Sequence, residues 1–185
     1  ETGISRSELL GLRWEDIDEA GRCIHINQGL VVYHSADEGK EVLESSGLKN
    51  KFRQRTIPIL DDTLWERLRQ ASRTVKKGNT IIITEQVIHS PEGRPYQPHN
   101  WESRVFRRFM KALHKAHPDV PELSPHELRH TRATLWIAQG MDPYMAARLL
   151  GHSDLKMLTK IYDHTSPETL RAALEKIRKT QEGTA

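Results

Sequence analysis

The sequence predicts an α+β domain that is mostly helical and carries one small antiparallel sheet. Three observations lead to this fold class. Before Ser124, short runs rich in β-branched residues alternate with helical segments. After Ser124, every segment is helical and the helices end at glycines. Apolar residues make up 36% of the 185 and fall in short periodic groups, which is enough for one core. At this length we expect residues 1–185 to form a single domain.

The composition favours some classes of protein and excludes others. Lysine and arginine (28) slightly outnumber aspartate and glutamate (25), which gives a net charge of +3. The pI of about 9.0 suits a nucleic-acid partner without establishing one. No apolar run approaches the length that spans a bilayer, and Ile81–Ile83 is only strand-sized. Because Cys23 is the single cysteine and no signal segment opens the chain, we expect a cytoplasmic protein without disulfides.

Residues up to Ile59 give one helix and two strands. Apolar residues at helical spacing predict a helix over Ser7–Ile17, which Gly21 would stop. The β-branched runs Cys23–Tyr33 and Arg55–Ile59 predict strands. The polar, acidic stretch His34–Leu48 between them is expected to be a long hairpin excursion.

The next segment predicts a helix followed by a strand. Asp62 is expected to cap a helix that runs through Val75 and ends at Gly78. Thr80–Ile88 then predicts a strand, and the prolines of Ser90–Pro98 predict a loop.

A two-faced helix is predicted over Asn100–His117. Its apolar face comprises Val105, Phe106, Phe109, Met110 and Leu113. Its basic face comprises Arg104, Arg107, Arg108, Lys111 and Lys115. That basic face is either a solvated helix surface or a surface that follows DNA phosphates.

The last part of the chain predicts three helices with clear boundaries. Ser124-Pro125 opens a helix that Gly140 ends, and Asp142-Pro143 opens another that Gly151 ends. Ser166-Pro167 opens a third, amphipathic helix over about residues 166–180.

The segment His126–His130 admits two interpretations. As H-E-x-x-H it would bind zinc through two histidines, with Glu127 as general base, as in zinc proteases. Against this, Ser124, Pro125 and Glu127 form the pattern of a helix start, which gives Glu127 a capping role. Arg129 would also place a cation between the two ligands. The capping role of Glu127 is therefore favoured over zinc binding, and no metal site is expected.

The second interpretation of His126–His130 is that it belongs to a site for phosphoryl transfer, and this interpretation uses more of the chain. His126 and Arg129 are three residues apart, so they project from one helix face. His152 follows a helix end, and Tyr162 stands ten residues later. A phosphate-binding guanidinium, two imidazoles and a phenol form a set suited to phosphoryl transfer through a covalent tyrosyl intermediate.

Four separated boxes resemble the tyrosine recombinase (phage integrase) family. They are the segments Thr2–Ile17, Lys49–Pro58, His126–Thr131, and Leu149–Ser153 with Tyr162–His164. They occur in the family's order and cover about residues 2–175, so the resemblance is specific although each box alone is weak. It implies the catalytic domain of a bacterial or phage integrase. It also implies a core-binding domain ahead of Glu1, where the chain starts without methionine.

The resemblance also implies roles for particular residues. Tyr162 would attack a DNA phosphodiester, Arg129 would bind its non-bridging oxygens, and His126 and His152 would donate hydrogen bonds or relay a proton. Lys49, or alternatively Lys51, would protonate the leaving 5′-oxygen. No cofactor is implied. The partners would be double-stranded DNA, contacted by the basic helix face, and three further copies of the chain in a tetramer on two DNA sites. The helix at 166–180 would dock in cis or on a neighbouring subunit.

One position departs from the family pattern. Ser5 stands where the first box normally has its phosphate-binding arginine, and Arg6 lies one residue later. A shift of one residue turns a side chain by about 100° around a helix. Three explanations stay open. Arg6 reaches the phosphate after local rearrangement, Ser5 weakens activity, or the chain is a degenerate recombinase that still binds DNA. Ser5 can also form a capping box with Glu8.

Overall fold

The structure is a computed structural model that describes residues 1–34, 41–47, 53–152 and 171. Predictions for Lys49, Lys51, Tyr162 and the helix at 166–180 lie outside the described residues. The chain divides into two compact units, Glu1–Ser153 and Asp154–Ala185. The elements below belong to the first unit.

A three-stranded antiparallel sheet contains most of the predicted strand Arg55–Ile59 but only the first part of the predicted strand Cys23–Tyr33, because the chain from Gln28 onward belongs to a separate hairpin. Its order is β1 (Ile17–Asp18), β2 (Cys23–Ile26) and β5 (Arg55–Pro58). Ile24 pairs with Ile57, so apolar side chains from both strands enter one core. The core also takes Leu12, Ile26, Ile59 and Trp65, which are all buried. The sheet therefore places Arg55, the first residue of β5, opposite Ile26, the last residue of β2.

The remaining strands form two hairpins. β3 (Gln28–His34) pairs with β4 (Glu41–Gly47), and β6 (Thr74–Lys77) pairs with β7 (Thr80–Ile83). The predicted hairpin excursion thus contains a full strand. In the described part of the chain the strands form three small antiparallel sheets, where the sequence predicted one.

The first predicted helix is shorter than expected. α1 covers Arg6–Gly11, and a 3₁₀ turn at Trp14–Asp16 then leads into β1. The backbone N–H of Trp14 donates to the Glu85 carbonyl at 3.0 Å, and its indole N–H donates to Thr84 at 3.3 Å. These tertiary hydrogen bonds replace the helical ones that the apolar periodicity of Ser7–Ile17 predicted.

The second predicted helix is also corrected. α2 covers only Asp62–Gln70, and its cap is Asp61, which accepts from the Leu64 N–H at 2.6 Å. The predicted continuation to Val75 is strand β6, and Gly78 (φ +59°) makes the turn into β7. β7 ends at Ile83 and not at Ile88. The β-branched residues prefer the hairpin once a partner strand is available.

A continuous helical run confirms the prediction over Asn100–His117. It consists of α3 (Pro98–Trp101), a π-helical turn (Glu102–Phe106) and α4 (Arg107–Ala116). Trp101 and Met110 are buried, but Phe109 is 59% exposed, so the predicted apolar face is only partly covered.

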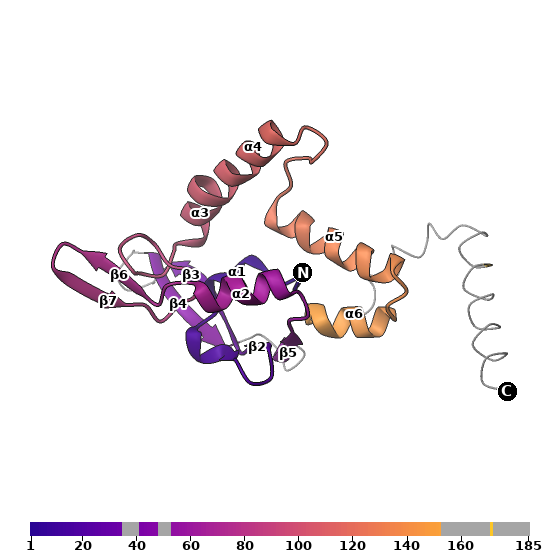
Figure 1. The fold of residues 1–185 in the computed structure, drawn as a ribbon, viewed down its shortest axis with the longest axis horizontal. Coiled ribbons are helices and arrows are strands. Elements are labelled where there is room, and N and C mark those ends of the chain that lie inside the picture. Colours follow the sequence, from indigo (N-terminus) through magenta and orange to yellow (C-terminus); the bar gives the residue numbers. More distant parts are fainter. Residues whose placement is uncertain (35–40, 48–52, 153–170, 172–185) are drawn as a thin grey trace. The chain divides into compact units, whose positions relative to one another are not determined.

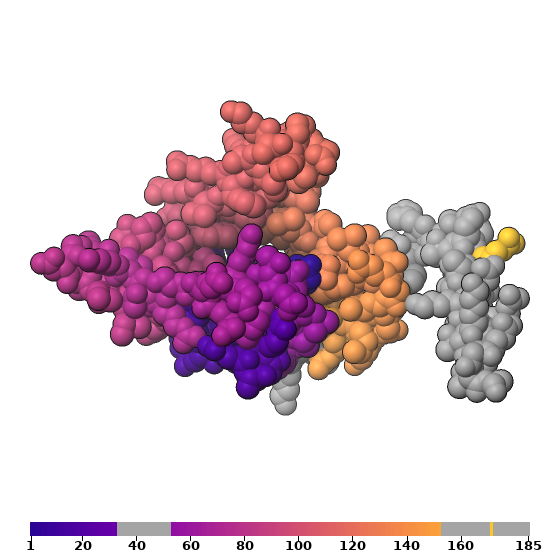
Figure 2. All heavy atoms as spheres, in the orientation of Figure 1, coloured from indigo at the N-terminus to yellow at the C-terminus, as the bar shows by residue number. Residues whose placement is uncertain are grey.

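Helices α5 (Pro125–Ala138) and α6 (Pro143–Leu150) follow the predicted boundaries closely. They pack side by side (Figure 1). Their surface, orange in Figure 2, meets the indigo atoms of the N-terminal segment, where Arg132 hydrogen-bonds to Glu1. The first and last described segments of this unit therefore come together. None of the helices in the described ranges is long and apolar enough to cross a membrane.

Candidate active site

The N-terminus of α5 fixes the positions of His126 and Arg129. Ser124 accepts from the Glu127 N–H at 3.2 Å, and the Glu127 carboxylate accepts from the Ser124 N–H at 2.7 Å. This reciprocal cap confirms the predicted capping box. The hydrogen bond with Ser124 lowers the pKa of Glu127, so its carboxylate is a weaker base than usual. Glu127 thus holds the helix end, which leaves the zinc-protease pattern without its free general base.

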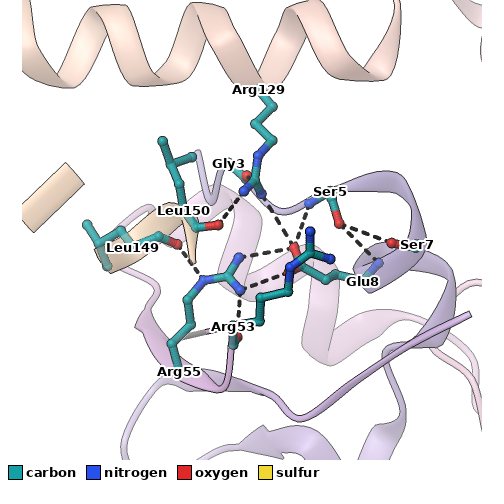
Figure 3. Close-up of polar contacts among 9 residues, drawn as sticks. All are labelled: Gly3, Ser5, Ser7, Glu8, Arg53, Arg55, Arg129, Leu149 and Leu150. Carbon is teal, nitrogen blue, oxygen red and sulfur yellow. Dashed lines mark hydrogen bonds and ion pairs between the residues drawn. The ribbon is translucent and has the colours of Figure 1, made fainter. Parts of the chain in front are cut away.

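Arg129 joins three parts of the chain at one point (Figure 3). Its Nη1 donates to the Gly3 carbonyl at 2.7 Å and to Glu8 Oε2 at 3.4 Å, and its Nη2 donates to the Leu150 carbonyl. Burial lowers the pKa of Arg129 to about 10, although the charge of Glu8 opposes that shift. The guanidinium therefore stays charged at neutral pH and is held in one orientation.

Glu8 and Arg55 form a buried ion pair beneath Arg129. Their side chains are 2% and 4% exposed, and Arg55 donates to both carboxylate oxygens of Glu8, at 2.9 and 3.1 Å. Arg55 Nε also donates to the Leu149 carbonyl at 2.6 Å. Burial alone would raise the pKa of Glu8, but the hydrogen bond and charge of Arg55 hold it below its ordinary value. One carboxylate therefore orients two guanidiniums from β5 and α5.

Two glycines make this close approach possible. Gly3 has φ +63°, and a Cβ there would lie 2.8 Å from a Leu150 methyl group. Gly151 has φ +72° and caps α6, and a Cβ there would lie 2.7 Å from Nη1 of Arg55. Any side chain at either position would be strained and would displace a contact of the arginine network.

A pocket of about 400 Å³ opens beside this network. It is lined by Ser5, Arg6, Ser7, Glu102, Ser124, Pro125, His126 and Arg129. The structure thus brings together Arg129 and His126, as the sequence predicted, and adds Arg6 to the same pocket. The Arg6 guanidinium forms an ion pair with Glu102, whose carboxylate also lies 3.9 Å from Arg107. Ser5 caps α1 through the predicted box with Glu8.

His152 lies at the end of α6, close to the same arginines. Burial, followed by the charge of Arg129, lowers the pKa of His152 to about 4. The imidazole is therefore neutral at pH 7. Its Nδ1 atom is buried and has no hydrogen-bond partner among the residues that the structure describes. A neutral imidazole can give one proton and take another, as a relay requires.

His126 and His130 contact each other one helical turn apart. Their Nε2 atoms are 2.8 Å apart and their rings meet edge to face, with centroids 4.3 Å apart. Burial lowers the pKa of His130, and the charges of His126 and Arg129 add to that shift. His126 is exposed and lines the pocket, whereas His130 is half-buried.

The basic helix face is exposed, which is expected both of a solvated helix surface and of a surface that contacts DNA phosphates. Arg104, Arg107, Arg108 and Lys111 are all exposed on the π turn and α4. Lys49, Lys51 and Tyr162, for which leaving-group and nucleophile roles were predicted, lie outside the described residues. The described part of the predicted site therefore consists of Arg129, His126, His152 and the Ser5–Arg6 pair.

One group of three side chains in the described ranges has metal-ligand chemistry, and it lies outside the pocket. The ligand atoms of Asp18, Cys23 and His25 lie within 4.8 Å of one another. Their own contacts account for this arrangement. Asp18 accepts from the Gly21 N–H at 2.9 Å and from the Cys23 thiol at 3.7 Å, and His25 bonds to Thr56 at 2.9 Å. The group thus closes the turn between β1 and β2.

Sequence reasoning missed Arg55 and Glu102 as parts of the site, and it saw Glu8 only as a helix cap. A signal for Glu8 was present, because Glu8 lies four residues before the buried Leu12, on the apolar side of α1. A carboxylate there must find a cation. Nothing in the sequence indicates that Arg55, 47 residues away, provides it.

Comparison with known proteins assigns the chain to a family. A sequence model described as the phage integrase family matches residues 1–169. The chain belongs to the phage integrase family. The match includes every box on which the resemblance rests, among them the segment with Tyr162.

Curated relatives of the family cover nearly the whole chain. The XerC-like tyrosine recombinase of Caldanaerobacter subterraneus is 27% identical, over 94% of this chain and 46% of that protein. XerC of Mycobacterium tuberculosis is 30% identical, over 95% and 50%. The ICEBs1 integrase of Bacillus subtilis is 27% identical, over 95% and 45%. The chain spans about half the length of these relatives.

Solved structures of the family share the fold. The integrase of the Tn1549 transposon, in complex with a circular intermediate DNA, superimposes with a TM-score of 0.74 and 26% identity, over 95% of this chain and 55% of that chain. XerA recombinase gives a TM-score of 0.60 at 22% identity, over 96% and 53%, which is a likeness of fold alone. The predicted α+β recombinase fold is confirmed.

Proposed function

We propose that this chain is the catalytic domain of a tyrosine recombinase that cleaves and rejoins double-stranded DNA through a 3′-phosphotyrosyl intermediate. The convergence of Arg129, His126 and Arg6 on one pocket carries the proposal. Two guanidiniums and an imidazole at one pocket suit a phosphodiester, whose two non-bridging oxygens share one negative charge. Membership of the phage integrase family supports the same reaction.

The proposed step exchanges one phosphoester for another. The Tyr162 oxygen attacks phosphorus, and its proton passes to an imidazole, for which the neutral His152 is suited. The bond from phosphorus to the 5′-oxygen breaks, and that oxygen takes a proton from Lys49, or alternatively from Lys51. Arg129 stabilises the charge that develops on the non-bridging oxygens. Because the ester bond energy is kept in the phosphotyrosyl link, the step needs no cofactor.

Arg6 supplies the second phosphate-binding cation in this proposal. Ser5 occupies the family's arginine position but is used as the cap of α1. Arg6 lines the same pocket and is held by the carboxylate of Glu102. A side chain that is 41% exposed can exchange part of this ion pair for a phosphate at small cost, because exposed ion pairs contribute only about 0–1 kcal/mol.

The proposed partners are DNA and further copies of the chain. The Tn1549 integrase was solved with DNA, and this chain carries exposed cations at Arg104, Arg107, Arg108 and Lys111. We propose that these cations contact the phosphates beside the pocket, in a tetramer on two DNA sites. The relatives are bacterial, and we propose that the reaction takes place in the cytoplasm of a bacterium.

A covalent-adduct assay tests this proposal. A randomised duplex pool is enriched for DNA that the chain binds. The enriched duplexes are then resynthesised with a nick that lets the cleaved fragment diffuse away, so that the adduct accumulates. We expect a protein–DNA adduct on a denaturing gel, with the DNA attached to Tyr162 by peptide mass spectrometry. Tyr162→Phe should give none. Arg6→Ala should slow formation about 10²–10³-fold, as loss of one charge-stabilising donor does.

The controls separate this proposal from a second candidate, a degenerate recombinase that only binds DNA. Ser5 in the arginine position is the observation that favours the second candidate. Arg69→Ala, which removes an exposed arginine paired with Glu66 on α2, should leave the rate unchanged. An adduct from Ser5→Arg but not from the wild-type chain would establish the remnant. If both bind the DNA and neither forms an adduct, the catalytic proposal is wrong.

A further inference from the structure

The contact between His126 and His130 has a chemical consequence for the proposed reaction. With the Nε2 atoms 2.8 Å apart, a hydrogen bond forms only if one of them carries a proton and the other does not. Two Nε2–H groups at this distance would place two donors against each other. The pair therefore holds a single proton between its Nε2 atoms, whether the pair as a whole is neutral or carries one positive charge.

The surroundings decide which ring keeps the extra proton. His130 is half-buried, and the described charged or titratable groups nearest to it are Glu127 and Arg129 on α5 and His152 after α6. Arg6 and Glu102, which pair with each other, line the pocket beside His126. Arg129 is a permanent cation, and burial with its charge lowers the pKa of His130. Glu127 opposes this shift, but its carboxylate is bound at the Ser124 cap. His152 is neutral at pH 7. The proton therefore belongs on the exposed His126, and His130 is the neutral acceptor.

We propose that His130 is a positioning residue for His126, because its neutral Nε2 accepts the Nε2–H of His126 and leaves Nδ1 as the ring nitrogen for the pocket. The role rests on the proposed function, since it specifies how His126 meets the scissile phosphate. His126 then donates to the phosphate through Nδ1–H with its ring orientation fixed. His130 itself does not touch the DNA. The pairing also leaves no free Nε2 lone pair for a zinc ion, because the His126 Nε2 is protonated and the His130 Nε2 accepts its hydrogen.

Imidazole NMR tests the pairing without DNA. Nitrogen-15 spectra of the full chain should show His126 protonated at Nε2, and His130 protonated at Nδ1 with an unprotonated Nε2. His130→Leu should remove the acceptor of this hydrogen bond, so that the His126 Nε2–H signal broadens through exchange with water. His130→Gln, whose carbonyl can accept the same hydrogen, should restore it.

The adduct assay extends the test to the reaction. The rate of adduct formation should fall in His130→Leu and return in His130→Gln. His117→Leu, at an exposed position after α4, should match the wild type. The proposal is overturned if His130→Leu leaves the His126 Nε2–H signal unchanged, or if His130→Gln fails to restore the rate that His130→Leu loses. One equivalent of Zn²⁺ that binds both rings would overturn it as well. The NMR result stands even if no adduct forms, so failure of the proposed function is recognised separately.

Discussion

At the scale of single residues, the site depends on one buried carboxylate. Glu8 is 2% exposed, binds Arg55 through both oxygens, and lies 3.4 Å from Arg129. Glu8 also caps α1 together with Ser5, and this role was predicted because the two residues are close in the sequence. Its role between two arginines follows only from the fold, because these partners are 47 and 121 residues away. The proposed phosphate-binding arginine is therefore oriented by a residue that the sequence motif identifies only as a helix cap.

Neutralising Glu8 should strongly destabilise the fold. We expect Glu8→Gln to lower the free energy of unfolding by about 3–5 kcal/mol, because it leaves a buried arginine without its counter-charge. The pH dependence follows from the lowered pKa of Glu8. Its contribution is present above the pKa of the unfolded chain and is lost as pH falls through the lower pKa of the folded state. Denaturant unfolding at pH 7 and at pH 3–4 measures both effects.

Glu66→Gln is the matched control for this prediction. Glu66 forms an exposed ion pair with Arg69 within α2, so the loss should be within about 0.5 kcal/mol. Equal losses from Glu8→Gln and Glu66→Gln would contradict the assigned role of Glu8. If the Glu8→Gln chain loses as much stability between pH 7 and pH 3–4 as the wild-type chain does, the pH argument is contradicted.

At the scale of elements, helix caps were predicted correctly except for that of α2, which is Asp61 and not Asp62, whereas tertiary strand partners were not predictable. The Ser124 and Asp142 caps and the end at Gly151 follow the sequence because each cap uses residues within a few positions. The segment 74–77 was predicted as helix and is strand β6, because its partner β7 outweighs the weak helical periodicity. Element boundaries were therefore reliable where the chain closes its own hydrogen bonds.

The contact of α1 with β3 gives a prediction at this scale. A Cβ on Gly11 would lie 2.9 Å from the backbone nitrogen of Leu30, and backbone there cannot yield cheaply. We expect Gly11→Ala to lower the free energy of unfolding by about 1–3 kcal/mol, through overpacking. The site should suffer as well, because α1 carries Ser5, Arg6 and Glu8. Thermal unfolding and the adduct assay measure the two losses.

Gly29 provides the control on the same interface. A Cβ there would meet Ser7 at 3.5 Å, an ordinary contact, and its φ is not in the left-handed region. Gly29→Ala should therefore be tolerated, with a change near zero. A chain that tolerates Gly11→Ala as well as Gly29→Ala would show that α1 and β3 can separate freely.

At the scale of the whole molecule, the proposed catalytic groups lie in two compact units. Arg129, His126 and Arg6 belong to residues 1–153, whereas Tyr162 belongs to residues 154–185. The first unit has its own buried clusters, one around Ile24 and Ile57 and another around Leu10, Leu30 and Trp101. We infer that it folds without the second unit. We also propose that the predicted helix at 166–180 docks on a neighbouring subunit.

Truncation after Ser153 tests both statements. All four tryptophans, at positions 14, 65, 101 and 136, lie in the first unit, so their fluorescence reports its unfolding alone. We expect the same denaturant midpoint in the truncated and full chains. Analytical centrifugation should show concentration-dependent association of the full chain and a monomeric truncated chain. A lower midpoint on truncation would contradict independent folding, and a full chain that stays monomeric would contradict docking on a neighbour.

The sequence by itself determined the family, the fold class, and the boundaries of α5 and α6, and it predicted His126, Arg129 and His152 as site residues. These follow from motif order and from caps, which involve residues close in the chain. Only the tertiary structure decided that Glu8 holds both Arg55 and Arg129, and that Arg6 faces the same pocket as His126. The reason is that a charge removed from water must be paired, and the chain finds its partners through folding.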